Sequence, residues 1–331
     1  MRLVFALLLL VAASSFARAN DSQAETALGG LVLVKSEAIS LDSEDLFISK
    51  DEVRVKYRFT NTTDKDIETL VAFPLPEQVY DESSPYYFID ATSDIGFKTV
   101  VEGKPVTYEI VQQAIVNGSD VTARLNALGW PLSSAKDFQV FNKKAADLDA
   151  ATRDALLKDG VITNAGTDSE PAYIPVWNVR TSITRTQVFP AGKTISVEHS
   201  YKPLVGGSVG GALNADYRNE DWGKERTRKY CIEDGWYKSF DKELAKRKTE
   251  ENPGPYSEWW LGYVLKSGAN WKGPIKDFHL VIDKGKPGNL VSFCADGVKK
   301  IGPTQFEVRK TDFEPQEDLN ILIVEWLDTQ Q

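Results

Sequence analysis

Histidines are scarce in this chain, which holds only His199 and His279 among its 331 residues. Neither has a second metal-binding residue at the spacing that a zinc site requires. His199 alternates with Val197 and Tyr201 on the apolar side of an expected strand, a position typical of a structural histidine rather than a base or a ligand. His279 follows Phe278 in another expected strand and is interpreted in the same way. We therefore expect no metal and no other cofactor.

Hydrolysis by paired carboxylates is the chemistry that the acidic residues could support. Glu198, Asp216, Glu220 and Asp221 lie close in sequence to aromatic residues that could stack on sugars, and most glycosidases act through two carboxyl groups. With 48 Asp and Glu in the chain, a solvated acidic surface is the simpler interpretation. A cell-envelope hydrolase acting on carbohydrate or peptidoglycan through an acidic pair is kept as the alternative function.

The glycine-rich stretch from Gly206 to Gly211 is the nearest approach to an active-site loop. It lacks the lysine of a phosphate-binding loop, and it follows Pro203 instead of joining a clear strand to a helix. We interpret it as a flexible connection.

A binding face is predicted at Trp177, His199 and Tyr201, on the assumption that the strands containing them border a groove. Aromatic residues are also dense around the first cysteine, where they could line a groove or fill a core. These residues are Trp222, Tyr230, Trp236, Tyr237, Trp259, Trp260 and Tyr263.

Cys231 and Cys294 are the only two cysteines in the chain. Neither has the Cys-x-x-Cys spacing of a redox motif, and two cysteines in an oxidising compartment most simply form one disulfide. Closing a loop of this length contributes roughly 4 kcal/mol in the chain-entropy model. Two buried free thiols, or one reactive nucleophile, are the other interpretations.

The first nineteen residues have the pattern of a secretory signal peptide. Arg2 precedes the apolar run from residue 3 to residue 13, and a small-x-small end predicts cleavage between Ala19 and Asn20. A retained membrane anchor is the alternative, but it would need about 20 apolar residues. We expect a periplasmic or secreted protein with no integral membrane segment after cleavage.

The net charge of the mature chain limits the classes of partner that it can bind. Removal of residues 1–19 takes away Arg2 and Arg18, which leaves 37 basic against 48 acidic residues and a net charge of −11. Nucleic acids and anionic lipids both attract basic surfaces, so this balance disfavours them. The expected partner is an unidentified ligand or an envelope protein.

Apolar and polar residues alternate with period two over most of the chain, which predicts strands with one buried face. Val53–Phe59 and Ile67–Phe73 are predicted to form one hairpin, and Val176–Phe189 and Thr194–Tyr201 another. Further strands are expected at Phe278–Ile282 and Leu319–Trp326, which flank the segments 292–294 and 305–309. Because the alternation indicates half-buried antiparallel strands, we predict a mainly β protein with an antiparallel β-sandwich-like architecture.

Helices are predicted in the middle of the chain, where they would interrupt the strands. Asp120 is a candidate N-cap for a helix to Leu128, a second helix is expected over Asp147–Lys158, and a third near Phe240–Lys248. We expect one β-rich domain over 20–331, in one lobe or in two lobes at 20–119 and 165–331, with a helical insertion at about 120–164.

Short segments along nearly the whole mature chain resemble an exported bacterial family catalogued as domain of unknown function 4424. They are 53–59 with 71–76 (Val-Ala-Phe-Pro-Leu-Pro), 177–180 (Trp-Asn-Val-Arg), 189–192 (Phe-Pro-Ala-Gly), 199–203 (His-Ser-Tyr-Lys-Pro), Tyr230-Cys231 and 292–294. The resemblance implies export and a shared fold, and it brings no activity, cofactor or site residue. From the signal peptide, the strand pattern and the absence of a recognisable catalytic constellation, we predict a non-enzymatic periplasmic binding or interaction protein.

Overall fold

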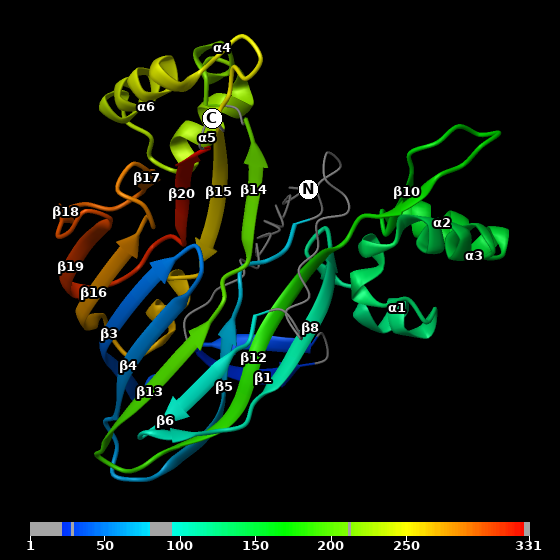
Figure 1. Ribbon diagram of the computed structural model, residues 1–331. Coiled ribbons are helices and arrows are strands. Elements are labelled where there is room, and N and C mark those ends of the chain that lie inside the picture. Colours follow the sequence, from blue (N-terminus) through cyan, green and yellow to red (C-terminus); the bar gives the residue numbers. More distant parts are fainter. Residues whose placement is uncertain (1–21, 28–29, 80–94, 211–212, 328–331) are drawn as a thin grey trace, which may run out of the picture.

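The computed structural model describes residues 22–27, 30–79, 95–210 and 213–327 (Figure 1). The predicted signal peptide and its cleavage site between Ala19 and Asn20 lie outside the described residues. No helix of the described part of the chain is both long enough and apolar enough to cross a membrane.

The largest layer, which we call sheet B, has eight strands in the order β18-β19-β16-β3-β4-β13-β6-β7. It forms because apolar residues alternate with charged ones along each long strand, so that one face is buried and the other faces solvent. Its strands are β3 (Ile39–Ser49), β4 (Val53–Asn61), β6 (Lys98–Val101), β7 (Lys104–Pro105), β13 (Thr194–Tyr201), β16 (Ile275–Asp283), β18 (Lys299–Lys300) and β19 (Gln305–Phe313).

Three smaller sheets complete the β structure. Sheet A has the order β2-β1-β5-β12-β8-β9, sheet C pairs β10 with β11, and sheet D has the order β14-β15-β20-β17. Within the described residues all neighbouring strands are antiparallel except β3 and β16, which are parallel. The strands of these sheets are β1 (Ser22–Ala27), β2 (Gly30–Val34), β5 (Ile67–Pro74), β8 (Glu109–Val116), β9 (Ser119–Asp120), β10 (Ile162–Asn164), β11 (Tyr173–Pro175), β12 (Asn178–Phe189), β14 (Val205–Val209), β15 (Tyr256–Tyr263), β17 (Leu290–Phe293) and β20 (Leu319–Trp326).

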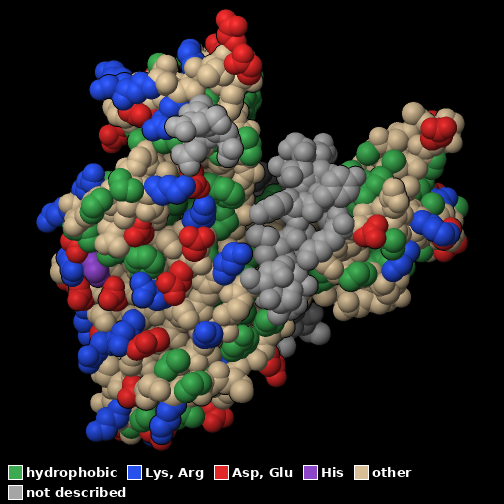
Figure 2. Space-filling view, viewed as in Figure 1, with side chains coloured by type: hydrophobic (Ala, Val, Ile, Leu, Met, Phe, Trp, Pro, Cys, Tyr) green, Lys and Arg blue, Asp and Glu red, His purple; other side chains and the backbone are tan. Residues whose placement is uncertain are grey.

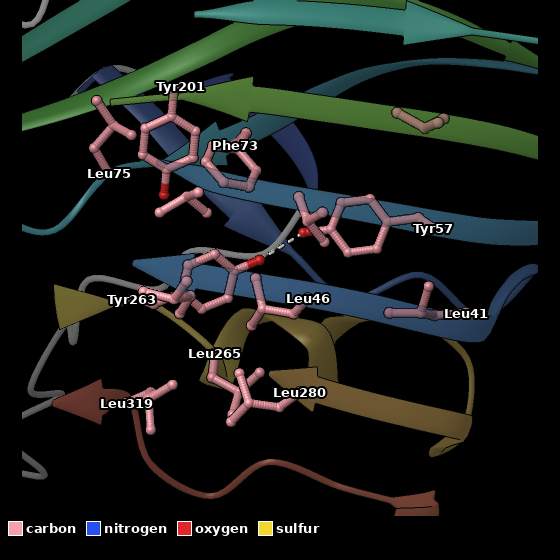
Figure 3. Packing of buried hydrophobic residues seen from close by; sticks show 14 of the residues in the cluster. Leu41, Leu46, Tyr57, Phe73, Leu75, Tyr201, Tyr263, Leu265, Leu280 and Leu319 are labelled. Carbon is pink, nitrogen blue, oxygen red and sulfur yellow. Dashed lines mark hydrogen bonds between the residues drawn. The ribbon is translucent and has the colours of Figure 1, made fainter. Parts of the chain in front are cut away.

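The main core lies where sheets A and D pack against the inner face of sheet B. Tyr57 from β4, Phe73 from β5 and Tyr263 from β15 meet there, and the hydroxyls of Tyr57 and Tyr263 are 2.9 Å apart (Figure 3). The predicted sandwich-like β architecture is therefore confirmed.

Both predicted hairpins are wrong. β4 pairs with β3 and β13 in sheet B, whereas β5 pairs with β1 and β12 in sheet A. In the same way β12 belongs to sheet A and β13 to sheet B. The two connections, residues 62–66 and 190–193, are thus arches that cross the core from one sheet to the other. Period-two alternation identifies the buried face of a strand, but it does not identify the neighbouring strand.

A helical segment is inserted between β9 and β10, as the sequence predicted. It contains α1 (Thr122–Ala127), the 3₁₀ helix η1 (Leu132–Lys136), α2 (Phe138–Ala146) and α3 (Ala150–Lys158). Three details differ from the prediction. The N-cap of α1 is Val121, which makes no side-chain capping bond, and not Asp120. The helix expected from Asp147 begins at Ala150, because Asp149 caps it by accepting a hydrogen bond from the Thr152 amide at 2.9 Å, and α2 was not predicted.

A second group of helices, which we call the helical cap, covers the face of sheet D that points away from sheet B (Figure 1). Its helices are α4 (Ala215–Arg218), α5 (Asp221–Lys229) and α6 (Asp234–Arg247), and the 3₁₀ helix η2 (Lys266–Asn270) follows β15. Helix α6 begins six residues before the predicted start at Phe240. Trp236 and Phe240 stack at 5.7 Å and belong to the core under the cap, which outweighs the poor helix propensity of Gly235.

The glycine-rich stretch also differs from its prediction as a flexible connection. Val205–Val209 form β14, a strand of sheet D paired with β15. A Cβ atom on Gly206 would lie 3.0 Å from Cε3 of Trp260, and one on Gly207 would lie 2.9 Å from Cε3 of Trp259. The glycines are therefore required because two tryptophan rings cover the backbone.

Candidate functional site

The residues of the predicted binding face are all buried. The exposed fractions are 5% for Trp177, 4% for His199 and 5% for Tyr201. Trp177 belongs to the core of the helical segment, where its Nε1 donates to the Leu132 carbonyl at 3.0 Å, whereas His199 packs at 5.0 Å from the ring of Phe73 in the main core. The structure brings His199 and Tyr201 together in β13 of sheet B and leaves Trp177 apart, because Trp177 directly precedes β12, which belongs to sheet A.

The outer face of sheet B carries a row of charged side chains that sequence reasoning did not identify. Along one line across five neighbouring strands stand Arg309 of β19, His279 of β16, Asp45 of β3, Lys56 of β4 and Glu198 of β13. Their cross-strand contacts include Lys56 Nζ to Glu198 Oε1 at 2.7 Å and His279 Nδ1 to Asp45 Oδ1 at 2.9 Å. Figure 2 shows basic and acidic side chains interleaved over these strands.

His279 also contacts a second carboxylate. Its Nε2 lies 3.0 Å from Glu307 Oε1, and Arg309 Nε donates to the same oxygen at 2.9 Å. The hydrogen bond from Arg309 lowers the pKa of the Glu307 carboxyl, so this end of the row is held in its charged form. The sequence placed His279 in a strand and predicted a structural histidine, but it did not reveal these partners, which come from two other strands.

Two adjoining hollows lie on this face. One has a volume of about 530 Å³ over β3, β4, β13 and β6, and the other has about 400 Å³ over β3, β4, β16 and β19. Asp45 and Lys56 line both hollows, so the two form one elongated depression, which we call the sheet B face. Phe47, Val100 and Val281 are its apolar lining in the larger hollow, and the rest is mostly polar.

Three charged residues of the sheet B face are not neutralised within the described structure. No carboxylate of the described residues lies within ion-pairing distance of Arg58 or Lys98, and no basic group lies within that distance of Asp277. Lys98 lines the larger hollow, whereas Arg58 and Asp277 line the smaller one. The depression therefore contains two positive charges and one negative charge that have no ionic partner among the described residues.

The acidic residues considered for hydrolysis lie in two separate parts of the fold. Glu198 lies in β13 on the sheet B face, while Asp216 belongs to α4, Glu220 caps α5 and Asp221 begins α5 (Figure 1). Glu198 is bound to Lys56, and the Asp221 carboxylate lies 3.6 Å from Lys224 Nζ. Glu198 is therefore separated from the other three, and both Glu198 and Asp221 already have a lysine partner.

The segment Gly206–Gly210 has the order Gly-x-Ser-x-Gly, so the interpretation that the sequence lacks this motif was wrong. In hydrolases this motif places the serine on a sharp turn between a strand and a helix. Here Ser208 lies inside β14, opposite Glu258 of β15. Ser208 therefore lies in an extended strand and not on the sharp turn of a nucleophile elbow.

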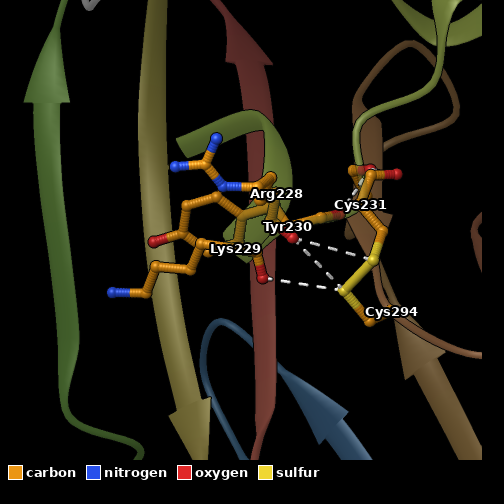
Figure 4. The surroundings of a disulfide bond; sticks show 6 residues. Arg228, Lys229, Tyr230, Cys231 and Cys294 are labelled. Carbon is orange, nitrogen blue, oxygen red and sulfur yellow. Dashed lines mark hydrogen bonds between the residues drawn. A yellow bond between two sulfur atoms is a disulfide. The ribbon is translucent and has the colours of Figure 1, made fainter. Parts of the chain in front are cut away.

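The predicted disulfide is present. Cys231, which follows α5, is bonded to Cys294, which follows β17, and the two Cα atoms are 5.0 Å apart. The bond fastens the helical cap to sheet D, and the carbonyl oxygen of Arg228 lies 3.7 Å from Cys294 Sγ (Figure 4). A buried ion pair between Arg226 of α5 and Glu258 of β15 joins the same two elements.

Comparison with known proteins gives one family and a set of distant structures. The family described as Domain of unknown function (DUF4424) matches residues 19–322. No curated protein sequence matches the chain.

Among solved structures, the chain is similar to a Legionella pneumophila protein described as a "putative nutrient binding protein". The two share 14% identity with a TM-score of 0.41, over 92% of this chain and 72% of that one. A second similar structure is an M1 zinc metallopeptidase from Deinococcus radiodurans, with 7% identity and a TM-score of 0.27, over 88% of this chain and 43% of the peptidase. The chain thus spans less than half of the peptidase.

Proposed function

We propose that this chain, which belongs to the family described as Domain of unknown function (DUF4424), is an exported binding protein without catalytic activity that holds its ligand across the sheet B face. The observation that supports this is the elongated depression in which Arg58, Lys98 and Asp277 have no ionic partner within the described residues. Charges carried by neighbouring strands of one sheet are suited to recognition, because the paired backbone sets their spacing before a ligand binds.

The pattern of charges indicates the kind of ligand. Neighbouring members of the row are spaced by one strand, or about 5 Å, so the five strands span about 20 Å. A ligand that satisfies Arg58, Lys98 and Asp277 together must carry both signs of charge along an extended shape. A peptide segment with acidic and basic side chains meets these conditions, and we propose this class of ligand.

Export is proposed on two grounds. The disulfide between Cys231 and Cys294 is of a kind that persists in oxidising compartments, and residues 1–19 have the composition of a signal peptide. Fractionation of cells producing the chain would test this, since the proposal requires the protein in the periplasm or the medium, with an N-terminus at Asn20.

The binding proposal can be tested on protein purified at low salt from its own cell envelope. Native and denaturing mass spectra would be compared for the wild type, for the variant Arg58→Ala/Asp277→Ala and for the control Lys144→Ala/Asp154→Ala. Both variants remove one charge of each sign from exposed positions, but the control lies in α2 and α3, away from the sheet B face.

We expect an added mass in the native spectra of the wild type and the control, with at least a tenfold lower occupancy in Arg58→Ala/Asp277→Ala. High salt should remove it, because the contacts are exposed charges. A bare mass in the wild type, or an added mass that survives in the variant, would contradict the proposal.

A further inference from the structure

We propose a second ligand site, an anion-binding cleft in the helical cap, which does not depend on the proposed role of the sheet B face. The cleft opens between α5 and α6, with the end of α4 beside it, and has a volume of about 520 Å³. Small-molecule sites have volumes of about 300 to 1,000 Å³, so one small ligand would fill it. We call it the cap cleft.

The cap cleft is electropositive in an acidic protein. Four basic residues line it against two acidic ones, namely Arg218, Lys224, Arg228 and Lys238 against Asp234 and Asp241. The segment 215–249 carries ten Lys and Arg and eight Asp and Glu, while the whole chain has a net charge of −9. Gathering like charges in a concave site raises the local concentration of small anions.

Arg218 forms a fixed wall of the cap cleft. Its Nη1 donates to Asp241 Oδ2 at 2.9 Å, a second bond joins Nη2 to Oδ1 of the same carboxylate, and Nε donates to the Leu213 carbonyl at 2.8 Å. The guanidinium also lies 4.0 Å from the ring centre of Tyr237. Because Asp241 neutralises Arg218, the excess positive charge of the cleft belongs to the other three basic residues.

Arg228 and Lys238 are the two cations available to a ligand. They lie on facing helices, both are exposed, and no carboxylate of the described residues lies within ion-pairing distance of either. Lys224 has only a loose contact at 3.6 Å to Asp221. The disulfide lies next to Arg228, with its two sulfurs 3.7 and 3.8 Å from the Arg228 carbonyl oxygen. The end of α5 that carries Arg228 is therefore tied covalently to the segment that follows β17.

Besides Asn219, which can both donate and accept, the cap cleft has two polar groups that can accept hydrogen bonds from a ligand. Thr227 Oγ1 donates to the Gly223 carbonyl at 2.9 Å, so in its 2.8 Å contact with Tyr237 the tyrosine hydroxyl is the donor. The lone pairs of Tyr237 and the carboxylate of Asp234 are then left as acceptors. Two cations beside two acceptors fit an anionic group attached to hydroxyls, and the structure assigns the cleft to a phosphorylated polyol.

The test uses ³¹P NMR line broadening with the full chain and glycerol 3-phosphate, with inorganic phosphate for comparison. Arg228→Gln/Lys238→Gln removes two charges from the cleft, and the control Lys229→Gln/Lys242→Gln removes two from the same helices outside it. We expect the wild type and the control to bind glycerol 3-phosphate equally and the cleft variant to bind at least tenfold more weakly. Asp234→Asn should abolish the preference for glycerol 3-phosphate over inorganic phosphate.

A membrane headgroup is the competing source of the same chemistry. The exposed aromatic residues Tyr217 and Trp222, 44% and 46% exposed, lie close to the cap cleft and could contact lipid. Sedimentation with phosphatidylglycerol vesicles separates the two sources. Binding to vesicles without binding of free glycerol 3-phosphate would overturn the proposal, as would equal affinities in the cleft variant and the control, or no line broadening with the wild type.

Discussion

The side-chain amide of Asn61 donates a hydrogen bond to the carbonyl oxygen of Phe189 at 2.8 Å, across 128 residues of sequence. Asn61 ends β4 and Phe189 ends β12, so this bond joins the two arches that cross between sheets A and B. The same amide donates to the Lys65 carbonyl at 2.7 Å, and the Asn61 side-chain oxygen accepts from the Thr63 amide at 2.9 Å. One fully buried side chain thus fixes both sheet crossings.

Replacement of Asn61 should destabilise the sandwich. Asn61→Ala leaves the carbonyls of Phe189 and Lys65 without their donor, and we expect a loss of about 2 to 4 kcal/mol in the free energy of unfolding. Asn61→Asp should be at least as damaging, because a carboxylate cannot donate. Urea unfolding measures both. The exposed Asp64→Ala in the same arch serves as the control, and an equal effect there would contradict the role given to Asn61.

Strand β14 gives a prediction that distinguishes a packed strand from a flexible connection. A Cβ on Gly207 would lie 2.8 Å from the Glu258 carbonyl oxygen, so the backbone of β15 would have to move. We expect Gly207→Ala to cost about 1 to 3 kcal/mol in the free energy of unfolding, and Ser208→Ala to cost less than about 0.5 kcal/mol. If Gly207→Ala unfolds at the same urea concentration as the wild type, the packing described for this strand is wrong.

The disulfide should stabilise the helical cap. Cys231 and Cys294 are 63 residues apart, and closing a loop of this length contributes about 4 kcal/mol when the unfolded chain is flexible. We expect Cys231→Ala/Cys294→Ala to lower the free energy of unfolding by about 2 to 4 kcal/mol. Hydrogen exchange should become faster in α5 and α6 before it changes in sheet B. Reduction of the wild type should reproduce the variant, and a wild type unaffected by reduction would exclude a stabilising bond.

Low pH should weaken the ion pair between Lys50, which follows β3 of sheet B, and Glu325 in β20 of sheet D. The hydrogen bonds from Lys50 at 2.8 Å and from Lys286 lower the pKa of Glu325 to about 2. Because the folded pKa lies below the unfolded value of about 4.3, this carboxylate stabilises the fold fully above about pH 5 and loses its effect as the pH falls toward 2. The shift corresponds to at most about 3 kcal/mol.

Glu325→Gln tests this connection. We expect the variant to be less stable than the wild type at pH 7 and the two stabilities to converge as the pH approaches 2. Glu314→Gln changes an exposed position, and its free energy of unfolding should follow that of the wild type over the whole pH range. A difference between Glu325→Gln and the wild type that stays constant from pH 7 to pH 2.5 would show that the charge of Glu325 is not responsible.

Local patterns in the sequence determined which segments form strands and helices and which face of a strand is buried. Alternation in Val53–Phe59 gave the strand and its buried face, because each side chain of a strand points to the side opposite that of its neighbour. Gly129 correctly marked the end of the α1 region, because a left-handed backbone position within one turn of the helix ends it. Asp120 was predicted as the N-cap of this helix, but the N-cap is Val121. The pairing of Cys231 with Cys294 followed from there being only two cysteines.

Only the tertiary structure decided which strands are neighbours, and with that the candidate sites. Residues 62–66 could close a hairpin or cross the core, and the choice depends on partners such as Phe189 that lie far away in sequence. Once β12 and β13 lie in different sheets, Trp177 and His199 are buried in separate cores. The row from Arg309 to Glu198 exists because five strands from distant parts of the chain are in register, and the cap cleft exists because α5 and α6 pack on sheet D. A single sequence does not encode such long-range contacts as a local pattern.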